Sequence, residues 1–505
     1  MNDESKSYRQ ILRSTSIVGG ASVINILIGL IRIKMAAILL GPSGVGLIGL
    51  LSNLMTMAAN VASLGAATVG TRQIAEAAGR EDARTMVGAR RALFWGSVLL
   101  ASVGSLIFWL LRGTIATQIL GAPGLSDEIG WLALGVGLTV AGGSQVALLN
   151  GLRRVGDLAR ISVYSALGAT ALGVGALLLW HDKGLLVYLL LTPVASFAVG
   201  YWYTSRLPKI VGPPTPLREM TQQWTTLVRL GMAFMIAGVA TTAGQFLVRT
   251  LVQRELGSDA LGHFEAAWVI SMTYIGFVLR AMGTDYYPRL TAVMHDHAVV
   301  NKLINEQTEV ALLLAAPVFL VMLGVAPWVI ELLYSRSFSE ATSVLRWQIL
   351  GDVLKVASWP LGFVLLASGD GRAFILSETL ATIVFVVFVW LGLPYFGLAA
   401  TGIGFLLMYA IYLPLVYSLV RRKTGFRWTK NLLVNTVVLL TSGALVVMIA
   451  LTHATAGAVS GIVTATAFGS YAFRKLTEVT ELNGPLMKLR KLTGKLILRG
   501  KAQDK

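Results

Sequence analysis

Residues 15–39 read TSIVGGASVINILIGLIRIKMAAIL, an apolar run that two cations, Arg32 and Lys34, interrupt near its end. About twenty apolar residues in a helix cross the hydrocarbon core of a bilayer, which is roughly 30 Å thick. A cleaved secretory signal has a shorter apolar segment and a small-residue cleavage site, so this run predicts a first membrane-spanning helix. A charge inside such a helix costs roughly 2.5–3.5 kcal/mol on insertion scales, so Arg32 and Lys34 are candidate functional residues.

The composition of the whole chain agrees with this start. Of its 505 residues, 55% are hydrophobic and only 13% are charged, against roughly 25% charged in soluble proteins. A soluble enzyme is therefore excluded, and the pattern predicts an all-α polytopic membrane protein. Apolar runs of spanning length predict fourteen helices, at 15–39, 44–66, 92–111, 129–149, 161–180, 184–204, 229–251, 265–284, 310–334, 345–366, 373–392, 398–419, 431–451 and 456–473.

The distribution of Lys and Arg between the connections predicts the orientation of the chain. With Arg229 and Arg346, at the ends of their spans, counted with the adjoining connections, 32 of the 42 basic residues fall on the side of the N-terminus, 5 on the opposite side and 5 deeper within the predicted helices. Because cytoplasmic connections carry the excess of Lys and Arg, both termini are expected to be cytoplasmic. The net charge of +17 then reflects topology and attraction to anionic headgroups, and it does not indicate nucleic-acid binding.

The C-terminal tail, residues 474–505, has an amphipathic pattern. Four leucines form a stripe among basic residues: Leu486, Leu489, Leu492 and Leu496. This pattern predicts a helix that lies on the inner leaflet. A basic tail that is merely solvated is the alternative.

A short motif indicates an internal duplication. Leu40-Gly41 with Gly46 follows the first predicted helix, and Leu256-Gly257 with Gly262 follows the seventh, at a constant offset of 216 residues. Each half has six helices, an even number, so the two repeats are expected to be parallel. The predicted organisation is an N-terminal six-helix lobe at 1–205, a cytoplasmic linker at 206–228, a C-terminal six-helix lobe at 229–423, two additional helices at 424–473 and the tail at 474–505.

Charged residues within or beside the spans are the candidate site. Arg32, Lys34 and Arg249 have no carboxylate within one helical turn of their own helix, so we expect them to bind an anionic passenger. Phosphate is the natural partner, because Arg offers planar bidentate donors and Lys a point charge. The predicted substrate-binding residues are Arg32, Lys34, Arg249, Arg280, Lys355 and Arg372; the predicted coupling or charge-pair residues are Asp352, Glu378, Glu265 and Asp285.

Structural roles compete with these functional ones. Asp352 and Lys355 are three residues apart and can neutralise each other, and Arg280 with Asp285 lies near the interface, where long side chains reach the headgroups. Glu378 is equally a candidate for a proton or cation coupling group and for a salt bridge to one of the cations.

The sequence shows no motif typical of a catalytic or cofactor site. The chain has no cysteine, no P-loop and no constellation of nucleophile and base. The predicted connections on the non-cytoplasmic side are short, whereas a membrane glycan polymerase or ligase usually has a sizeable outer loop or domain. We therefore expect a protein that is not an enzyme and that needs no cofactor or metal.

Three stretches resemble a known family, the Wzx-type lipid-linked oligosaccharide flippases of the multidrug/oligosaccharidyl-lipid/polysaccharide exporter superfamily. They are KMAAILLGP at 34–42, GTDYYPRL at 283–290, and the pair WQILGDVLKV at 347–356 and RAFILSE at 372–378. The last pair is similar to the enterobacterial common antigen and O-antigen flippases. The family typically has twelve helices, so the last two helices and the tail depart from its pattern.

The resemblance implies a function and a location. It implies alternating access between two six-helix lobes, with a glycan on undecaprenyl pyrophosphate turned from the cytoplasmic to the periplasmic leaflet of the bacterial inner membrane. Membrane potential or a cation gradient would reset the lobes, and a polysaccharide polymerase and a chain-length regulator would be partners in O-antigen and lipopolysaccharide synthesis. The alternatives are a lipid II flippase, a drug/cation antiporter of the same superfamily and, from a different class, a membrane glycan polymerase or ligase.

Overall fold

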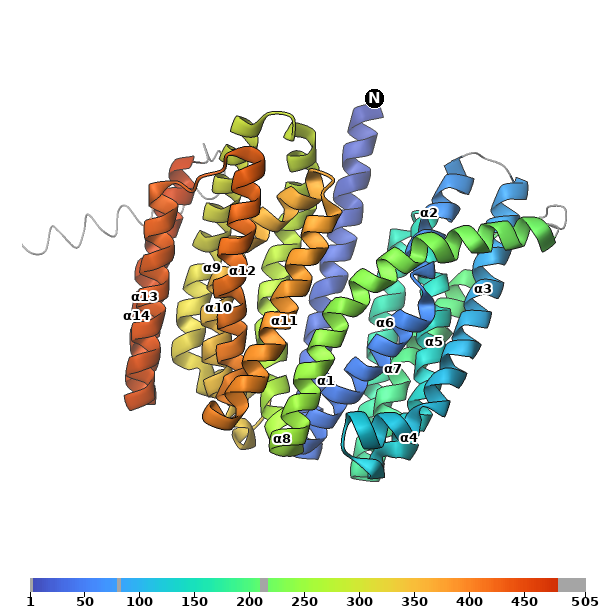
Figure 1. Cartoon of the computed structure of the whole chain (residues 1–505), viewed down its shortest axis with the longest axis horizontal. Helices are drawn as coiled ribbons and strands as arrows, with labels where there is room; N and C mark the ends of the chain where they lie inside the picture. The colour runs from blue at the N-terminus through green and yellow to red at the C-terminus, as the bar shows by residue number, and fades with distance from the viewer. Residues whose placement is uncertain (1–2, 80–82, 209–216, 480–505) are drawn as a thin grey trace, which may run out of the picture. The chain divides into compact units, whose positions relative to one another are not determined.

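The computed structural model describes residues 3–79, 83–208 and 217–479, and all regular secondary structure in that part of the chain is helical (Figure 1). The predicted leucine stripe of the tail lies outside the described residues. The helices are α1 (Asp3–Ser63), α2 (Ala66–Gly79), α3 (Ala83–Leu110), α4 (Arg112–Thr114), η1 (Ile115–Ile119), η2 (Pro123–Leu125), α5 (Ser126–Gly151), α6 (Val155–Trp180), η3 (His181–Gly184), α7 (Leu185–Ser205), α8 (Leu217–Val293), α9 (His297–Leu333), η4 (Arg336–Phe338), α10 (Ala341–Ala367), α11 (Gly371–Phe396), α12 (Ala399–Thr424), α13 (Lys430–Thr452) and α14 (Ala454–Val479).

The prediction of a polytopic all-α membrane protein is confirmed. Ten segments of the described chain are long and apolar enough to cross a membrane, and two of these, Ile17–Ser63 and Val155–Ser205, are long enough for two crossings each. The spans predicted at 229–251 and 265–284 both lie on α8. Large apolar side chains such as Leu179 and Leu332 are more than two-thirds exposed, as expected of helices that face lipid rather than water.

The described helices form two compact units. The larger contains the chain up to Tyr274 together with Ala326–Gly351 and Asp370–Leu415, and the smaller contains Ile275–Val325, Asp352–Gly369 and the chain from Val416 onward.

Within the larger unit, the first seven helices pack pairwise, with α3 on α5, α6 on α7, and α1 on both α6 and α5. Helix α2 occupies the connection that the sequence predicts between the spans at 44–66 and 92–111. Its buried side chains Ile74 and Ala77 join Met86 and Leu93 of α3 in an apolar cluster. This amphipathic helix is too short and too polar to be recognised as a span.

Helices α1 and α8 are each broken at one glycine. Gly41 has φ 64° and ψ −166°, and Gly257 has φ 86° and ψ −179°. A positive φ is strained for other L-residues, so glycine is required at both breaks. The two breaks are 216 residues apart, at the positions of the repeated Leu-Gly motif, which supports the predicted parallel duplication.

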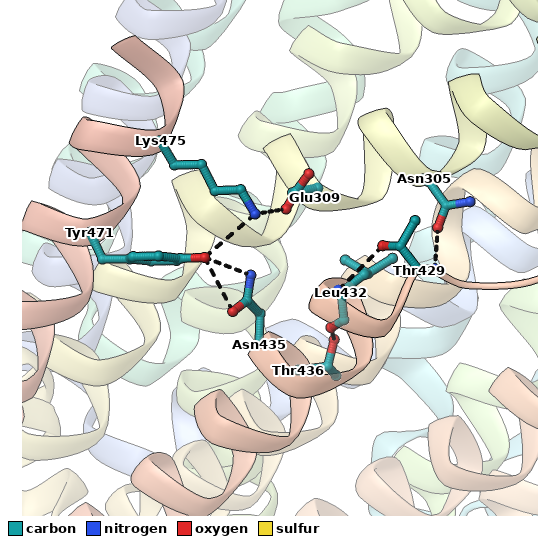
Figure 2. Close-up of polar contacts among 8 residues, drawn as sticks. All are labelled: Asn305, Glu309, Thr429, Leu432, Asn435, Thr436, Tyr471 and Lys475. Carbon is teal, nitrogen blue, oxygen red and sulfur yellow. Dashed lines mark hydrogen bonds and ion pairs between the residues drawn. The ribbon is translucent and has the colours of Figure 1, made fainter. Parts of the chain in front are cut away.

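Within the smaller unit, α13 and α14 pack on each other and on α9 through polar side chains (Figure 2). Lys475 of α14 forms an ion pair with Glu309 of α9, and Asn435 of α13 is 3.3 Å from the Tyr471 hydroxyl of α14. Glycines also bring α14 close to α9, because a Cβ on Gly461 would lie 2.7 Å from the Leu320 carbonyl oxygen. The two additional helices are therefore held by specific contacts.

Two boundaries differ from the sequence prediction. Helix α8 begins at Leu217, so residues 217–228 of the predicted linker are helical. Helix α14 continues to Val479, past the predicted start of the tail at 474. In both places the amphipathic turns at the membrane surface continue a helix beyond its apolar core.

Candidate functional site

The Arg249 side chain, from the predicted seventh span on α8, is buried against a carboxylate of the same helix. Its Nε contacts Glu265 Oε1, and its Nη2 donates to Glu265 Oε2 at 3.1 Å. The two residues are only 5% and 3% exposed. The break at Gly257 returns the chain on itself, so that residues 16 apart in sequence form a bidentate pair. Such a pair has high geometric specificity, but it must offset the loss of hydration of both charges.

Glycine on α1 makes room for this pair. A Cβ on Gly49 would overlap the Glu265 carboxylate, so α1 passes directly against the ion pair. The guanidinium also lies 5.6 Å from the ring centroids of Phe264 and Trp268. Both aromatic rings lower the local polarity, which strengthens the electrostatic interaction.

Lys34 of α1 caps the C-terminal end of α9. Its Nζ donates to the carbonyl oxygens of Glu331 at 3.0 Å and Tyr334 at 2.5 Å. The last carbonyls of a helix have no partner within the helix and carry the negative end of its dipole, so an ammonium group is stabilised there. Lys34 is half-buried.

Arg32, one half-turn before Lys34, contacts α7. Its Nη2 donates to the Tyr188 carbonyl oxygen at 2.9 Å, and its guanidinium carbon lies 4.3 Å from the centroid of the Tyr188 ring. The Tyr188 hydroxyl in turn donates a hydrogen bond to the Arg32 carbonyl oxygen at 3.4 Å. A cation over an aromatic face gains electrostatic stabilisation without a counter-charge.

These three cations belong to one neighbourhood, because Tyr334, which accepts from Lys34, interacts electrostatically with both Glu265 and Tyr188. We call Arg32, Lys34, Arg249 and Glu265 the cationic cluster. Three positive charges and one negative charge give it a net charge of +2.

The expectation that all three cations lack a carboxylate partner is wrong for Arg249. The reason is the helix break, which brings Glu265 to it from well beyond one turn. In the part of the chain that the structure describes, Lys34 and Arg32 are held by carbonyl oxygens and by a ring, and neither forms an ion pair with a carboxylate.

The other predicted residues of the larger unit lie elsewhere. Glu378 of α11 is half-buried and accepts a hydrogen bond from the Tyr412 hydroxyl of α12. Arg372 is exposed at the start of α11, in a turn where the Asp370 carboxylate accepts from the Ala373 N–H at 3.1 Å.

Three predicted residues of the smaller unit are also placed. Asp352 is fully buried and Lys355 is half-buried, both on α10. Asp285 is exposed and forms an ion pair with Arg289 at 3.0 Å, one turn away, which suits a structural role at the interface. The Arg280 side chain lies outside the described residues.

Aromatic residues near the cluster are the part of the site that the sequence analysis missed. Trp268 stacks on Phe385 with centroids 6.0 Å apart and meets Phe405 edge-on at 5.7 Å. Tyr188 offers its ring and its hydroxyl to Arg32, whereas Tyr412 donates its hydroxyl to Glu378, outside the cluster. A Tyr or Trp within a predicted span was the signal in the sequence.

Among the described residues, no group of three or more His, Asp or Glu side chains is placed to hold a metal ion.

The chain is similar in sequence to known proteins. Residues 11–294 match the family described as polysaccharide biosynthesis protein. The chain is 24% identical over 415 residues to the lipid III flippases of Escherichia coli (strain K12) and Shigella flexneri, covering 80% of this chain and 97% of each relative.

Solved structures share the fold. The lipid II flippase MurJ, in an inward closed conformation, matches with a TM-score of 0.71 at 12% identity, over 90% of this chain and 98% of that one. An inward-facing multidrug resistance transporter of the MATE family matches with a TM-score of 0.63 at 18% identity, over 79% and 94%. The chain thus has the fold of the MOP superfamily, and it belongs to the polysaccharide biosynthesis protein family.

Proposed function

We propose that this protein is a flippase that turns an undecaprenyl-pyrophosphate-linked oligosaccharide from the cytoplasmic to the periplasmic leaflet of the inner membrane. The observation that carries the proposal is the cationic cluster, in which carbonyl oxygens and a ring, rather than any carboxylate of the described residues, hold Arg32 and Lys34. A pyrophosphate offers several anionic oxygens, which match guanidinium and ammonium donors. The 24% identity to lipid III flippases supports the same substrate class.

The partners of the three cations suggest how binding and movement are linked. Carbonyl oxygens and a tyrosine ring are weaker partners than a phosphate oxygen, so pyrophosphate competes for Lys34 and Arg32. Because Lys34 bonds the end of α9, its transfer to the substrate releases that contact between helices distant in sequence. Differential binding of this kind shifts the balance between two conformations. An oligosaccharide of the O-antigen type and coupling to membrane potential or a cation gradient are parts of this proposal.

The charge of the cluster argues against the rival functions. A drug/cation antiporter needs an acidic binding site, whereas the cluster has a net charge of +2. A lipid II flippase shares the pyrophosphate and differs in the glycan, so substrate competition distinguishes it. If the protein acts in O-antigen assembly, a polysaccharide polymerase and a chain-length regulator are its expected partners.

The test is transport by the full-length protein in proteoliposomes loaded with undecaprenyl-pyrophosphate-linked oligosaccharide. Lys34→Met and Arg32→Met should each lower the flipping rate at least about tenfold, because a hydrogen bond to a charged group contributes about 1.5–3 kcal/mol. Lys302→Met, which removes an exposed cation from α9, is the matched control. Rates for Lys34→Met and Arg32→Met equal to that of Lys302→Met would contradict the proposal.

A further inference from the structure

A groove of about 880 Å³ lies between α3 and α5, on helices of the larger unit that the transport mechanism does not use. Its volume is within the range of roughly 300–1,000 Å³ that is typical of small-molecule sites. Both helices are of spanning length and composition, so the groove opens to lipid along the membrane. An occupant must therefore have an apolar part.

Small residues create the groove. Ser105 of α3 donates to the Ala133 carbonyl oxygen of α5 at 2.8 Å, which joins the two helices at the floor. Gly137 faces the same serine, since a Cβ there would lie 2.5 Å from Ser105 Oγ. The rim is built from larger apolar side chains, of which Leu106 and Leu134 are at least half exposed. A floor of small residues between apolar rims suits an extended acyl chain.

The groove ends in charged and aromatic side chains where α3 ends and α5 begins. Trp109 holds Arg112 there in two ways. Arg112 Nη1 donates to the Trp109 carbonyl oxygen at 3.2 Å, and the Arg112 guanidinium carbon lies 3.9 Å from the centroid of the Trp109 ring. Gly130 lets the Arg112 stem cross α5, since a Cβ there would be 2.8 Å from Arg112 Cδ. A guanidinium carries five N–H donors, and this hydrogen bond uses one of them.

An opposite charge lies at the same end. Asp127, in the first turn of α5, is exposed and lines the groove together with Arg112 and Trp131. Tryptophan is enriched at the level of lipid headgroups, so this end coincides with the membrane–water interface. By the predicted topology it is the non-cytoplasmic end.

We propose that the groove is a binding site for one phospholipid with a zwitterionic phosphate–ammonium headgroup, such as phosphatidylethanolamine. The phosphate binds Arg112, the ammonium group binds Asp127, and one acyl chain fills the groove over Ser105 and Gly137. Charges of both signs at one end of an apolar groove match this headgroup, whereas an anionic lipid meets repulsion from Asp127. This site is separate from the cationic cluster and does not depend on the proposed transport.

Native mass spectrometry of the full chain in detergent tests the site, with phosphatidylethanolamine or phosphatidylglycerol added at equal concentration. We expect one retained phosphatidylethanolamine and at least fivefold less phosphatidylglycerol. Ser102→Phe, which places a ring in the groove from an exposed position on α3, and Arg112→Gln should each lower retention at least fivefold. Asp127→Asn should remove the preference between the two lipids.

Two matched variants serve as controls. Ala171→Phe adds the same ring at an exposed position of α6, and Lys183→Gln removes an exposed cation on the same predicted side. Both should retain phosphatidylethanolamine as the unchanged chain does, and glycerophosphoethanolamine, which has no acyl chains, should not be retained. Retention that is unaffected by Ser102→Phe and Arg112→Gln, or equal for both lipids, would overturn the proposal.

Discussion

Gly46 of α1 and Gly262 of α8 occupy equivalent positions in the two halves of the chain, and each packs against the turn that precedes the other. A Cβ on Gly46 would lie 2.6 Å from the Ser258 carbonyl oxygen, and a Cβ on Gly262 would overlap the carbonyl group of Pro42. Ser258 is itself the equivalent of Pro42, 216 residues on. The contact is therefore reciprocal, as in a two-fold symmetric interface. It holds the two broken helices together without side chains.

This close approach predicts that a side chain at Gly46 separates the two turns. The chain has no cysteine, so a single Ser258→Cys substitution gives a specific label site. In that background, Gly46→Leu should raise the rate of labelling by a membrane-impermeant maleimide several-fold. Gly20→Leu is the control, since no atom of the described residues lies within 4 Å of a Cβ at Gly20 on the same helix. Equal labelling in the two variants would show that the turns tolerate the side chain without opening.

The buried ion pair predicts a strong asymmetry between single and double variants. Glu265→Gln leaves the Arg249 guanidinium buried without its counter-charge, which typically costs about 3–5 kcal/mol. A double variant, Arg249→Met with Glu265→Gln, removes the charge as well and should recover much of that loss. Thermal unfolding in detergent, followed by size-exclusion chromatography, measures the difference.

An exposed pair provides the control for that comparison. Arg289→Gln breaks the ion pair between Arg289 and Asp285, in which the two side chains are 58% and 70% exposed. This change should alter the unfolding free energy by at most about 1 kcal/mol. If Glu265→Gln were no more destabilising than Arg289→Gln, the pair would not be buried as described.

Which helices form could be predicted from the sequence, because apolar length is a local property. The predicted spans correspond to helices, and the glycine motif marks both breaks correctly, at Gly41 and Gly257. Helix α2 and the first turns of α8 were missed, since surface helices lack the apolar length that identifies a span.

The partners of the charged residues could not be predicted in the same way. Glu265 reaches Arg249 only because of the break at Gly257, and Lys34 meets carbonyl oxygens about 300 residues away. Main-chain acceptors leave no mark in a sequence, because every residue has one. Spacing within one helical turn therefore predicts too many of these cations to lack a carboxylate.

His263 predicts a dependence of stability on pH. It lies between the two predicted spans of α8, where burial lowers the pKa of its imidazole from the ordinary 6.5. The Glu340 carboxylate, whose Oε2 is 3.9 Å from His263 Nε2, partly opposes this shift. The unfolded chain then binds a proton more readily than the folded one, so this contribution is complete above about pH 6.5 and is lost as the pH falls through the folded pKa. Thermal unfolding should show a smaller loss of stability from pH 7 to pH 5 in His263→Gln. His295→Gln, at an exposed position, should keep the full dependence.

The glycine contacts of α14 predict that the two additional helices cannot accept bulk where they meet α9. A Cβ on Gly461 would lie 2.7 Å from the Leu320 carbonyl oxygen and 3.0 Å from the Gly324 Cα, both of them backbone atoms. Gly461→Leu should therefore destabilise the smaller unit by about 1–3 kcal/mol or more, the usual range for overpacking. Val463→Leu, at an exposed position two residues on, should leave the melting temperature unchanged. Lys475→Met should lower the melting temperature less than Gly461→Leu does, because the ion pair between Lys475 and Glu309 is partly exposed. A second contact also remains in this variant, in which Asn305 accepts from the Thr429 N–H at 2.9 Å (Figure 2). Equal melting temperatures for Gly461→Leu and Val463→Leu would mean that α14 is free to move away from α9.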